Sequence, residues 1–388
     1  MRDVTTRQNL SNVRDVSPRS GTLIDAGHWL VAPQPAADNV PALIHTIHRR
    51  AELRSVECRG PVEAARCESD SSTNSLTPER TASMTRFVLR SLCLLSLLAL
   101  PWSSAARAQD MALSTVLIEG ENWQLVAEGY KFTEGPAVDR DGTVYFVDVP
   151  DSLILKIGGD GKPVVWARDT GKASGLMFGP EGRLYACQSG TKQIVWYDRN
   201  AKPTVLATDI AGNDITVDAK GGVYVTDMGG KQVWYVAPDG SKRVVASGFM
   251  PNGLTLWPDG GTLVVADWEH PALQTFRVEA DGGLKFQDRY YGPVQIPAGQ
   301  DKPGSDGMTV DDIGRLFVAT HAGLQMFDPT GRPCGAITKP QTKFLSNVKF
   351  GGPDFDTVYV TSSDRIYKRK LKTKGTPHFL RAAVAATK

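Results

Sequence analysis

The chain has 388 residues, and its 44 Lys and Arg residues against 42 Asp and Glu residues give a formal net charge of +2. A balance this close to neutral, without a basic run interleaved with aromatic residues, argues against a nucleic-acid partner and against an acidic tail. The composition predicts no particular oligomeric state.

The first segment, residues 1–83, contains no lysine and is rich in arginine and serine without a hydrophobic period. Such a composition does not build a packed core. We predict that residues 1–83 carry no function and are either a non-native segment, with translation beginning at Met84, or a disordered leader.

The next segment, residues 84–108, has the three parts of a secretory signal peptide. A basic start is followed by the apolar run Leu92–Leu100 and by a small-x-small cleavage site that ends at Ala108. The apolar run is too short to remain as a membrane-spanning helix. We therefore expect a periplasmic or secreted protein without a permanent membrane anchor.

Residues 109–380 contain six copies of one sequence repeat. Each copy begins with an acidic, amide or hydroxyl residue, continues as an apolar strand, turns near a glycine, and returns as a second apolar strand. The opening residues are Glu134, Ser174, Asn213, Asn252, Asp306 and Asn347. Their spacings of 40, 39, 39, 54 and 41 residues are typical of four-stranded propeller blades. The sequence predicts an all-β fold, a six-bladed β-propeller.

Residues 123–127 are predicted to close the ring. Two apolar residues followed by alanine precede four of the openings, and three of these segments must be the outer strand of the preceding blade. By the same logic, Trp123–Ala127 is the outer strand of the last blade. An N-terminal strand in the last blade removes the free sheet edges that invite aggregation.

The opening residues should meet at one mouth of the central channel. Because the second strand of each blade runs antiparallel to the first, its end returns beside the opening residue. Glu134, Asn213, Asn252 and Asp306 together offer carboxylate and amide oxygens with a formal charge of minus two, which suits a hard divalent cation. The alternative is that these side chains cap strands or hold water.

Several segments resemble the signature of the gluconolactonase and regucalcin (senescence marker protein) family. They are Thr133–Pro136, Pro251–Leu254, Pro258–Gly260, Ser305–Met308 and Phe350–Pro353, and the likeness extends from about Gly120 to Leu371. The resemblance implies a six-bladed propeller with one divalent metal in the channel, and many members of that family hydrolyse sugar lactones.

The resemblance also implies roles for individual residues. Glu134, Asn252 and Asp306 match the family's metal ligands, and Asn213 matches an asparagine near the metal that also contacts the substrate. Asp306 is the implied general base, or the group that orients the attacking water. The metal would be Ca²⁺ first, with Mg²⁺, Mn²⁺ or Zn²⁺ as alternatives.

Three departures from the family pattern concern the substrate. Ala211 stands where some relatives have an arginine, Ser174 where a subset has asparagine, and Val138 where tryptophan is frequent. The metal site is therefore expected to be intact and the sugar contacts altered.

The expected activity is hydrolysis of a small-molecule lactone of the sugar type. Besides Asn213, the residues predicted to bind substrate are Asp227, Asp267 and His270, at the second-strand ends and in a mouth loop. His321 is either a proton donor or a surface histidine. Two alternatives stay open: a phosphotriesterase of the diisopropylfluorophosphatase type, and a non-catalytic, cation-binding propeller that serves as a binding module.

Two cysteines, Cys187 and Cys334, follow the cleavage site. They fall in the second and fifth blades, on opposite sides of a six-bladed ring, beyond the roughly 7 Å between Cα atoms that a disulfide allows. We predict two thiols and no disulfide.

Overall fold

A computed structural model of the protein describes residues 112–375. The predicted leader and signal peptide lie outside the described residues, as do the two ends of the predicted propeller domain. The described part is all-β apart from one short 3-10 turn, η1 (Leu113–Thr115). No helix within it is long and apolar enough to cross a bilayer.

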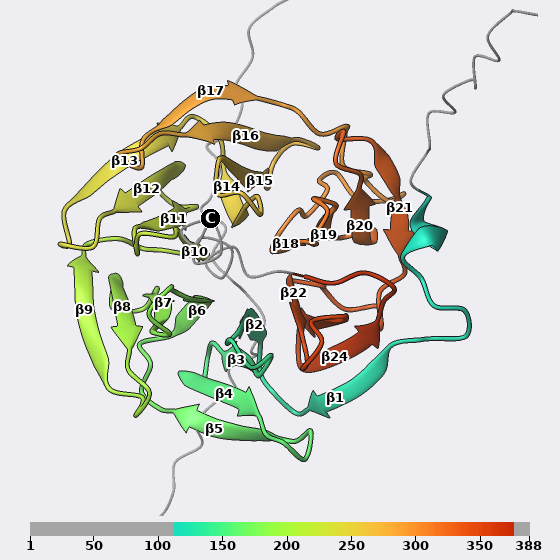
Figure 1. Ribbon diagram of the computed structural model, residues 1–388, viewed down its shortest axis with the longest axis horizontal. Coiled ribbons are helices and arrows are strands. Elements are labelled where there is room, and N and C mark those ends of the chain that lie inside the picture. The colour runs from blue at the N-terminus through green and yellow to red at the C-terminus, as the bar shows by residue number, and fades with distance from the viewer. Residues whose placement is uncertain (1–111, 376–388) are drawn as a thin grey trace, which may run out of the picture. The chain divides into compact units, whose positions relative to one another are not determined.

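Twenty-four strands form six four-stranded antiparallel sheets arranged around a central axis (Figure 1). Blade 1 consists of β2 (Thr133–Val138), β3 (Val144–Asp148), β4 (Leu153–Ile157) and β5 (Pro163–Ala167). Blade 2 consists of β6 (Ala173–Phe178), β7 (Leu184–Gln188), β8 (Gln193–Tyr197) and β9 (Pro203–Thr208). Blade 3 consists of β10 (Ile215–Val217), β11 (Val223–Asp227), β12 (Gln232–Val236) and β13 (Lys242–Ser247).

The remaining blades follow the same plan. Blade 4 consists of β14 (Pro251–Leu256), β15 (Thr262–Asp267), β16 (Leu273–Val278) and β17 (Leu284–Asp288). Blade 5 consists of β18 (Met308–Val310), β19 (Leu316–Thr320), β20 (Gly323–Phe327) and β21 (Pro333–Ile337). Blade 6 consists of β22 (Asn347–Gly351), β23 (Thr357–Ser362), β24 (Arg365–Lys370) and the N-terminal β1 (Gln124–Glu128). The predicted six-bladed propeller is confirmed.

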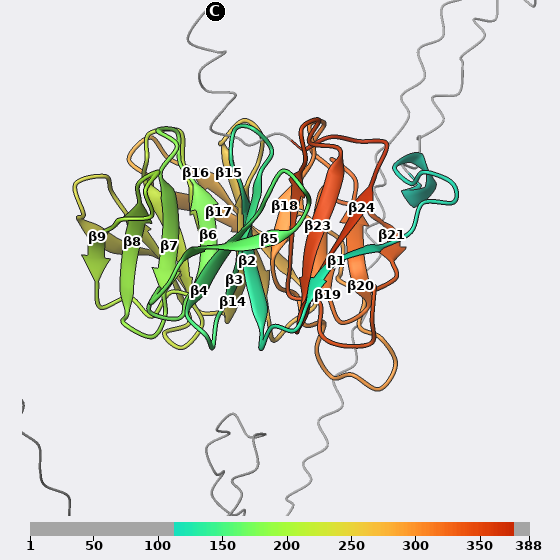
Figure 2. The same ribbon diagram turned by 90° about the horizontal axis from the view of Figure 1, so that it is seen from below.

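The ring is closed by β1, which pairs antiparallel with β24 at the outer edge of blade 6. The first and last strands of the propeller thus lie side by side although they are far apart in the sequence (Figures 1 and 2). The sequence predicted this strand at residues 123–127, one residue from where it is found. An exposed ion pair, Arg365 Nη2 to Glu128 Oε2 at 2.9 Å, joins the same two strands.

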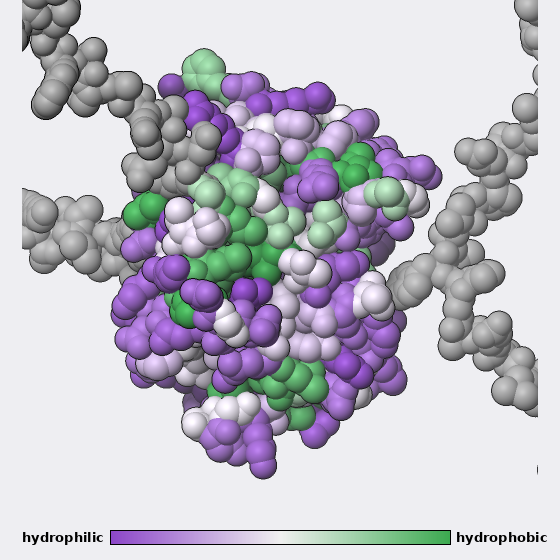
Figure 3. Space-filling model, turned by 90° about the vertical axis from the view of Figure 1, so that its right-hand side faces the viewer, coloured by the Kyte–Doolittle hydropathy of each residue, from purple (hydrophilic) through white to green (hydrophobic). Residues whose placement is uncertain are grey.

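Each seam between neighbouring blades has its own apolar core. The cluster between blades 5 and 6 includes Phe317 and Phe350, whose rings meet edge to face at 5.5 Å. Half-buried Leu113, Leu117 and Trp123 pack against this cluster from the N-terminal segment, and apolar side chains gather among polar ones on that side of the ring (Figure 3). A propeller built in this way is held together by nearest-neighbour packing.

The repeated aspartate after the first strand closes a turn. In blade 1, Asp139 Oδ1 accepts the backbone N–H groups of Asp141 and Thr143 at 3.0 and 2.9 Å. Blade 3 has the same arrangement at Asp218. These side chain to backbone bonds replace ladder bonds that the turn lacks, and they explain the Asp-x-x-Gly register that runs through the sequence.

The inner strands approach one another closely around the axis, and glycine makes this possible. A Cβ on Gly253 would lie 2.1 Å from Asp306 O, and one on Gly307 would lie 1.9 Å from Asn347 Cγ. Both glycines directly follow an opening residue. The opening side chains are therefore held at a narrow channel.

Candidate metal and catalytic site

The opening residues lie at one end of the channel, as antiparallel pairing requires. In blade 1, Thr133 pairs with Asp148 and Glu134 with Val147, so Glu134 lies near the start of β2, beside the end of β3. In blade 5, the N–H of Asp306 donates to Ala319 O at 2.9 Å, next to the end of β19. The same arrangement in the other blades brings six opening residues to a single mouth.

The structure brings the four predicted ligands together in two connected groups. Asn213 Nδ2 donates a hydrogen bond to Asn252 Oδ1, and Asn252 Nδ2 donates to Ser305 O at 3.5 Å. The Asn252 side chain also acts on the neighbouring Asp306 carboxyl by lowering its pKa. Asn347 Nδ2 donates to Glu134 Oε2 at 3.1 Å. Asn252 and Asp306 are buried, whereas Glu134 and Asn213 keep part of their surface exposed.

The two carboxylates are strongly perturbed. Burial first, and then the negative charge of Asp214, raise the pKa of Glu134 to about 7. Burial, followed by the charges of Glu134 and Asp214, raises the pKa of Asp306 well above its ordinary value. Both shifts arise because negative charges are crowded in a place with little water.

Two further charged residues in the channel were not predicted from the sequence. Asp214 follows Asn213, and Asn347 Nδ2 donates to its Oδ2 at 3.4 Å. Lys349 lies on the inner strand β22, and its Nζ donates to Met308 O at 3.0 Å. Burial lowers the pKa of the Lys349 ammonium, while the charges of Asp214 and Glu134 act in the opposite direction.

Both missed residues left a signal in the repeat. Asp214 takes the place that a glycine holds in four other blades, at positions 135, 175, 253 and 307. Lys349 is a charge inside an otherwise apolar inner strand. A polar residue where the repeat has an apolar or glycine position indicates a side chain that faces the channel. Asp214 and Lys349 carry opposite charges, so Glu134 and Asp306 still account for the net charge of the mouth.

The donor set fits one hard divalent cation. Glu134 and Asp306 are two mutually repelling carboxylates, and a cation between them would offset the charge that raises both pKa values. Asn213 and Asn252 can each turn an amide oxygen to such an ion. Within residues 112–375, no cluster of three or more His, Cys, Asp or Glu side chains is arranged to hold a metal. A site here therefore depends on the two amides.

The residues predicted to bind substrate lie at the same end of the blades but belong to local networks. Asp227 accepts the Gly230 N–H at 2.8 Å and Gln232 Nε2 at 3.0 Å. Asp267, which is 1% exposed, accepts His270 Nδ1 at 3.0 Å.

Asp267 and His270 also line a polar pocket of about 340 Å³ with Gln274, Gln287 and Arg289. No contact between these residues and Glu134 or Asp306 is described in the part of the chain that the structure covers. Substrate binding by Asp227, Asp267 and His270 stays a prediction.

The predicted thiols also have defined surroundings. Cys187 is fully buried in blade 2, and its Sγ donates weakly to Asp214 O at 3.7 Å. Cys334 lies half-buried on β21 of blade 5. No disulfide joins these two cysteines.

The family of the protein follows from its sequence and agrees with its fold. The sequence family described as the SMP-30/Gluconolactonase/LRE-like region matches residues 132–364, more than half of the chain. The protein belongs to this family, which confirms the resemblance seen in the sequence.

Particular relatives are similar at modest identity. A gluconolactonase of Zymomonas mobilis is 25% identical over 300 residues, which cover 65% of this chain and 82% of the relative. A pentonolactonase of Haloferax volcanii is 25% identical over 256 residues, which cover 62% and 84%.

Solved structures support the fold. A gluconolactonase from Xanthomonas campestris aligns with a TM-score of 0.58 at 24% identity, covering 67% of this chain and 92% of that one. The calcium-binding protein regucalcin from Agrobacterium tumefaciens aligns with a TM-score of 0.58 at 19% identity, covering 66% and 96%.

Proposed function

We propose that the protein is a metal-dependent lactonase that opens a lactone of the sugar type, with one divalent cation at the channel mouth. The observation that carries the proposal is the convergence of Glu134, Asn213, Asn252 and Asp306 on one mouth, with both carboxylate pKa values raised. Membership of the SMP-30/Gluconolactonase/LRE-like family, together with the similarity to a gluconolactonase and a pentonolactonase, supports lactone hydrolysis.

The cation would be held by the carboxylates of Glu134 and Asp306 and the amide oxygens of Asn213 and Asn252. Oxygen donors of this kind favour Ca²⁺, and Mg²⁺, Mn²⁺ and Zn²⁺ are the alternatives. When bound, a divalent cation supplies a Lewis acid for the lactone carbonyl oxygen.

The chain's own groups position the water. Asp306 is buried at the mouth, and its carboxylate is the group we assign to orient the attacking water or to accept its proton. A carboxylate beside a cation is a weak base, so positioning is its main contribution. Water adds to the carbonyl carbon, the ring C–O bond breaks, and the proton ends on the departing oxygen to give a hydroxy acid.

The test is a lactone panel on a chain that begins at Gln109, titrated with Ca²⁺, Mg²⁺, Mn²⁺ and Zn²⁺. Asp306→Asn and Glu134→Gln should each lower kcat/KM by about a thousandfold or more while the thermal melt stays cooperative. Asp239→Asn, a change at an exposed turn on blade 3, is the matched control.

Other outcomes would decide against the proposal. Turnover of phosphotriesters without turnover of lactones would favour a phosphotriesterase. No hydrolysis of any lactone, ester or phosphotriester with any cation would leave a cation-binding module without chemistry.

We also propose that the protein is exported, on the strength of the three-part segment at residues 84–108. Expressed with this segment in a bacterium that has two membranes, the protein should reach the periplasm with Gln109 at its N-terminus. Mass spectrometry of the intact protein checks this, and a cytoplasmic, uncleaved product would contradict it.

A further inference from the structure

Three rings from three different blades meet in one cluster. The ring centroids of Trp268 and His321 are 5.9 Å apart, those of Trp268 and Phe344 are 5.9 Å apart, and those of His321 and Phe344 are 5.5 Å apart. All three pairs meet edge to face, an arrangement that adds to the stability of aromatic packing. Each side chain is only half-buried, so the cluster presents apolar surface. We call it the aromatic wall.

Two members of the aromatic wall are tied to the backbone beside the channel residues. The N–H of Trp268 donates to Met250 O at 2.9 Å, immediately before β14 begins. The N–H of His321 donates to Pro303 O at 2.9 Å, three residues before the buried carboxylate of blade 5. Both residues directly follow the end of a second strand, so they lie at the same mouth as the opening residues.

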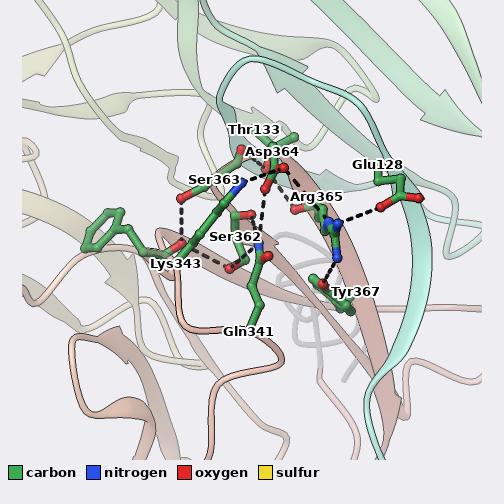
Figure 4. A network of polar contacts seen from close by, with 10 residues as sticks. Glu128, Thr133, Gln341, Lys343, Ser362, Ser363, Asp364, Arg365 and Tyr367 are labelled. Atoms are coloured by element: carbon green, nitrogen blue, oxygen red, sulfur yellow. Dashed lines mark hydrogen bonds and ion pairs between the residues drawn. The ribbon is translucent and has the colours of Figure 1, made fainter. Parts of the chain in front are cut away.

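The third member is held by a polar network at the hairpin of blade 6 (Figure 4). The carbonyl of Phe344 accepts hydrogen bonds from the hydroxyls of Ser362 and Ser363 at 3.1 and 3.3 Å. Its neighbour Lys343 makes an ion pair with Asp364 at 2.7 Å. Because these contacts engage the loop and not the phenyl ring, Phe344 is positioned independently of its own side chain.

The chemistry of the aromatic wall is apolar. Burial, together with the charge of Lys339, lowers the pKa of His321, and the contact of its Nδ1 with Lys302 O at 3.2 Å acts the other way. The lowered pKa favours the neutral imidazole, which packs edge to face against the rings of Trp268 and Phe344. The inner strands offer carboxylate and amide oxygens at the channel, and the aromatic wall lies at the same mouth on blades 4, 5 and 6.

We propose that Trp268, His321 and Phe344 determine specificity by packing against an apolar substituent of the lactone. The inference rests on the proposed lactone hydrolysis, and it moves the preferred substrate from a hydroxylated sugar lactone to a lactone with an apolar substituent. Favoured lactones carry an alkyl or aryl group beside the ring ester, with the carbonyl end toward Glu134 and Asp306. Sites of this kind combine a few convergent polar groups with apolar and aromatic walls.

The test compares two lactones with the same six-membered ring, δ-valerolactone and δ-nonalactone, with Ca²⁺ added. Wild type should prefer the butyl-bearing δ-nonalactone by at least about tenfold in kcat/KM. Trp268→Ala and Phe344→Ala should each reduce that preference by about tenfold, mainly through KM. Phe286→Ala, at an exposed ring on β17, is the matched control and should not alter the preference.

The two-lactone test has outcomes that contradict the inference. An unchanged preference in folded Trp268→Ala and Phe344→Ala, or a wild type that favours δ-valerolactone, would overturn the inference. If Trp268→Ala does not fold, Phe344→Ala carries the test alone, because its loop is anchored through the backbone.

Failure of the proposed function can be told apart from failure of the aromatic wall. Hydrolysis of sugar lactones but of neither test lactone overturns the inference. If wild type hydrolyses no lactone of the panel, including these two, lactone hydrolysis is wrong. Calorimetric binding of the unreactive lactam 6-butylpiperidin-2-one then tests the wall directly. Binding about tenfold weaker in Phe344→Ala supports it, and equal binding in the two proteins rejects it.

Discussion

Burial first, and then the charge of Asp214, raise the pKa of Glu134, whereas burial and the charges of Glu134 and Asp214 raise the pKa of Asp306. In a protein stripped of cations, Glu134 holds its proton until a pH of about 7, whereas its ordinary value is 4.5. The folded state therefore binds more protons than the unfolded chain between these two values. Its free energy of unfolding must fall as the pH rises through that window.

The first prediction follows from this fall of the free energy of unfolding with rising pH. With a chelator present, wild type should lose stability between pH 4.5 and about pH 7, with roughly 3 kcal/mol as the contribution of Glu134. Glu134→Gln removes the titrating group and should show a shallower loss, measured by urea unfolding at several pH values. Excess Ca²⁺ should reverse the trend, because the cation competes with protons. Equal slopes for wild type and Glu134→Gln in chelator would contradict the prediction.

The ligand candidates were predictable because antiparallel pairing fixes which strand ends meet, whatever the rest of the fold does. Asp214 and Lys349 were not predictable, because each residue departs from the type that the repeat has at its position. What Lys349 faces is set by blades 3, 5 and 6 meeting across the axis, and this is a property of the closed ring. The sequence shows such a residue as an irregularity without showing its partner.

At the scale of the element, strand β1 is the component on which closure depends. It pairs with β24 over Gln124–Glu128, and without it the outer edge of blade 6 is exposed. Unpaired edges favour association with other chains. The ion pair between Arg365 and Glu128 adds little, since both side chains are solvent-exposed.

A chain that begins at Tyr130 lacks β1 and therefore tests whether this strand is needed to close the ring. It should melt about 10 °C or more below a chain that begins at Gln109, because it loses a whole strand and the packing of its N-terminal segment. It should also aggregate in a concentration-dependent way, measured by light scattering. Equal melting temperatures for the two chains would show that blade 6 is complete without β1.

This strand was predictable to within one residue because its alanine signature recurs before other blades. The strand count was predictable because every blade repeats the same hairpins and turn aspartates. The contacts of the mouth loops, such as those of Phe344, were not predictable from the sequence. They depend on loops that differ from blade to blade and meet only after the ring has closed.

At the scale of the whole molecule, Cys187 reports on the opening of the propeller. It is fully buried in the core between blades 2 and 3, and burial, followed by the charge of Asp214, raises its thiol pKa well above the usual value. A thiol reagent can attack it only when the packed seam opens.

A cation that binds only the folded ring should protect this thiol. In a chain from Gln109 with Cys334→Ser, Cys187 is the single thiol, and Ca²⁺ at a hundred times its Kd should slow labelling about a hundredfold. The double variant Glu134→Gln, Asp306→Asn should show no such slowing. If calorimetry shows binding yet labelling keeps its rate, Cys187 is reached by a local opening that leaves the cation in place, and the blades do not open as one unit.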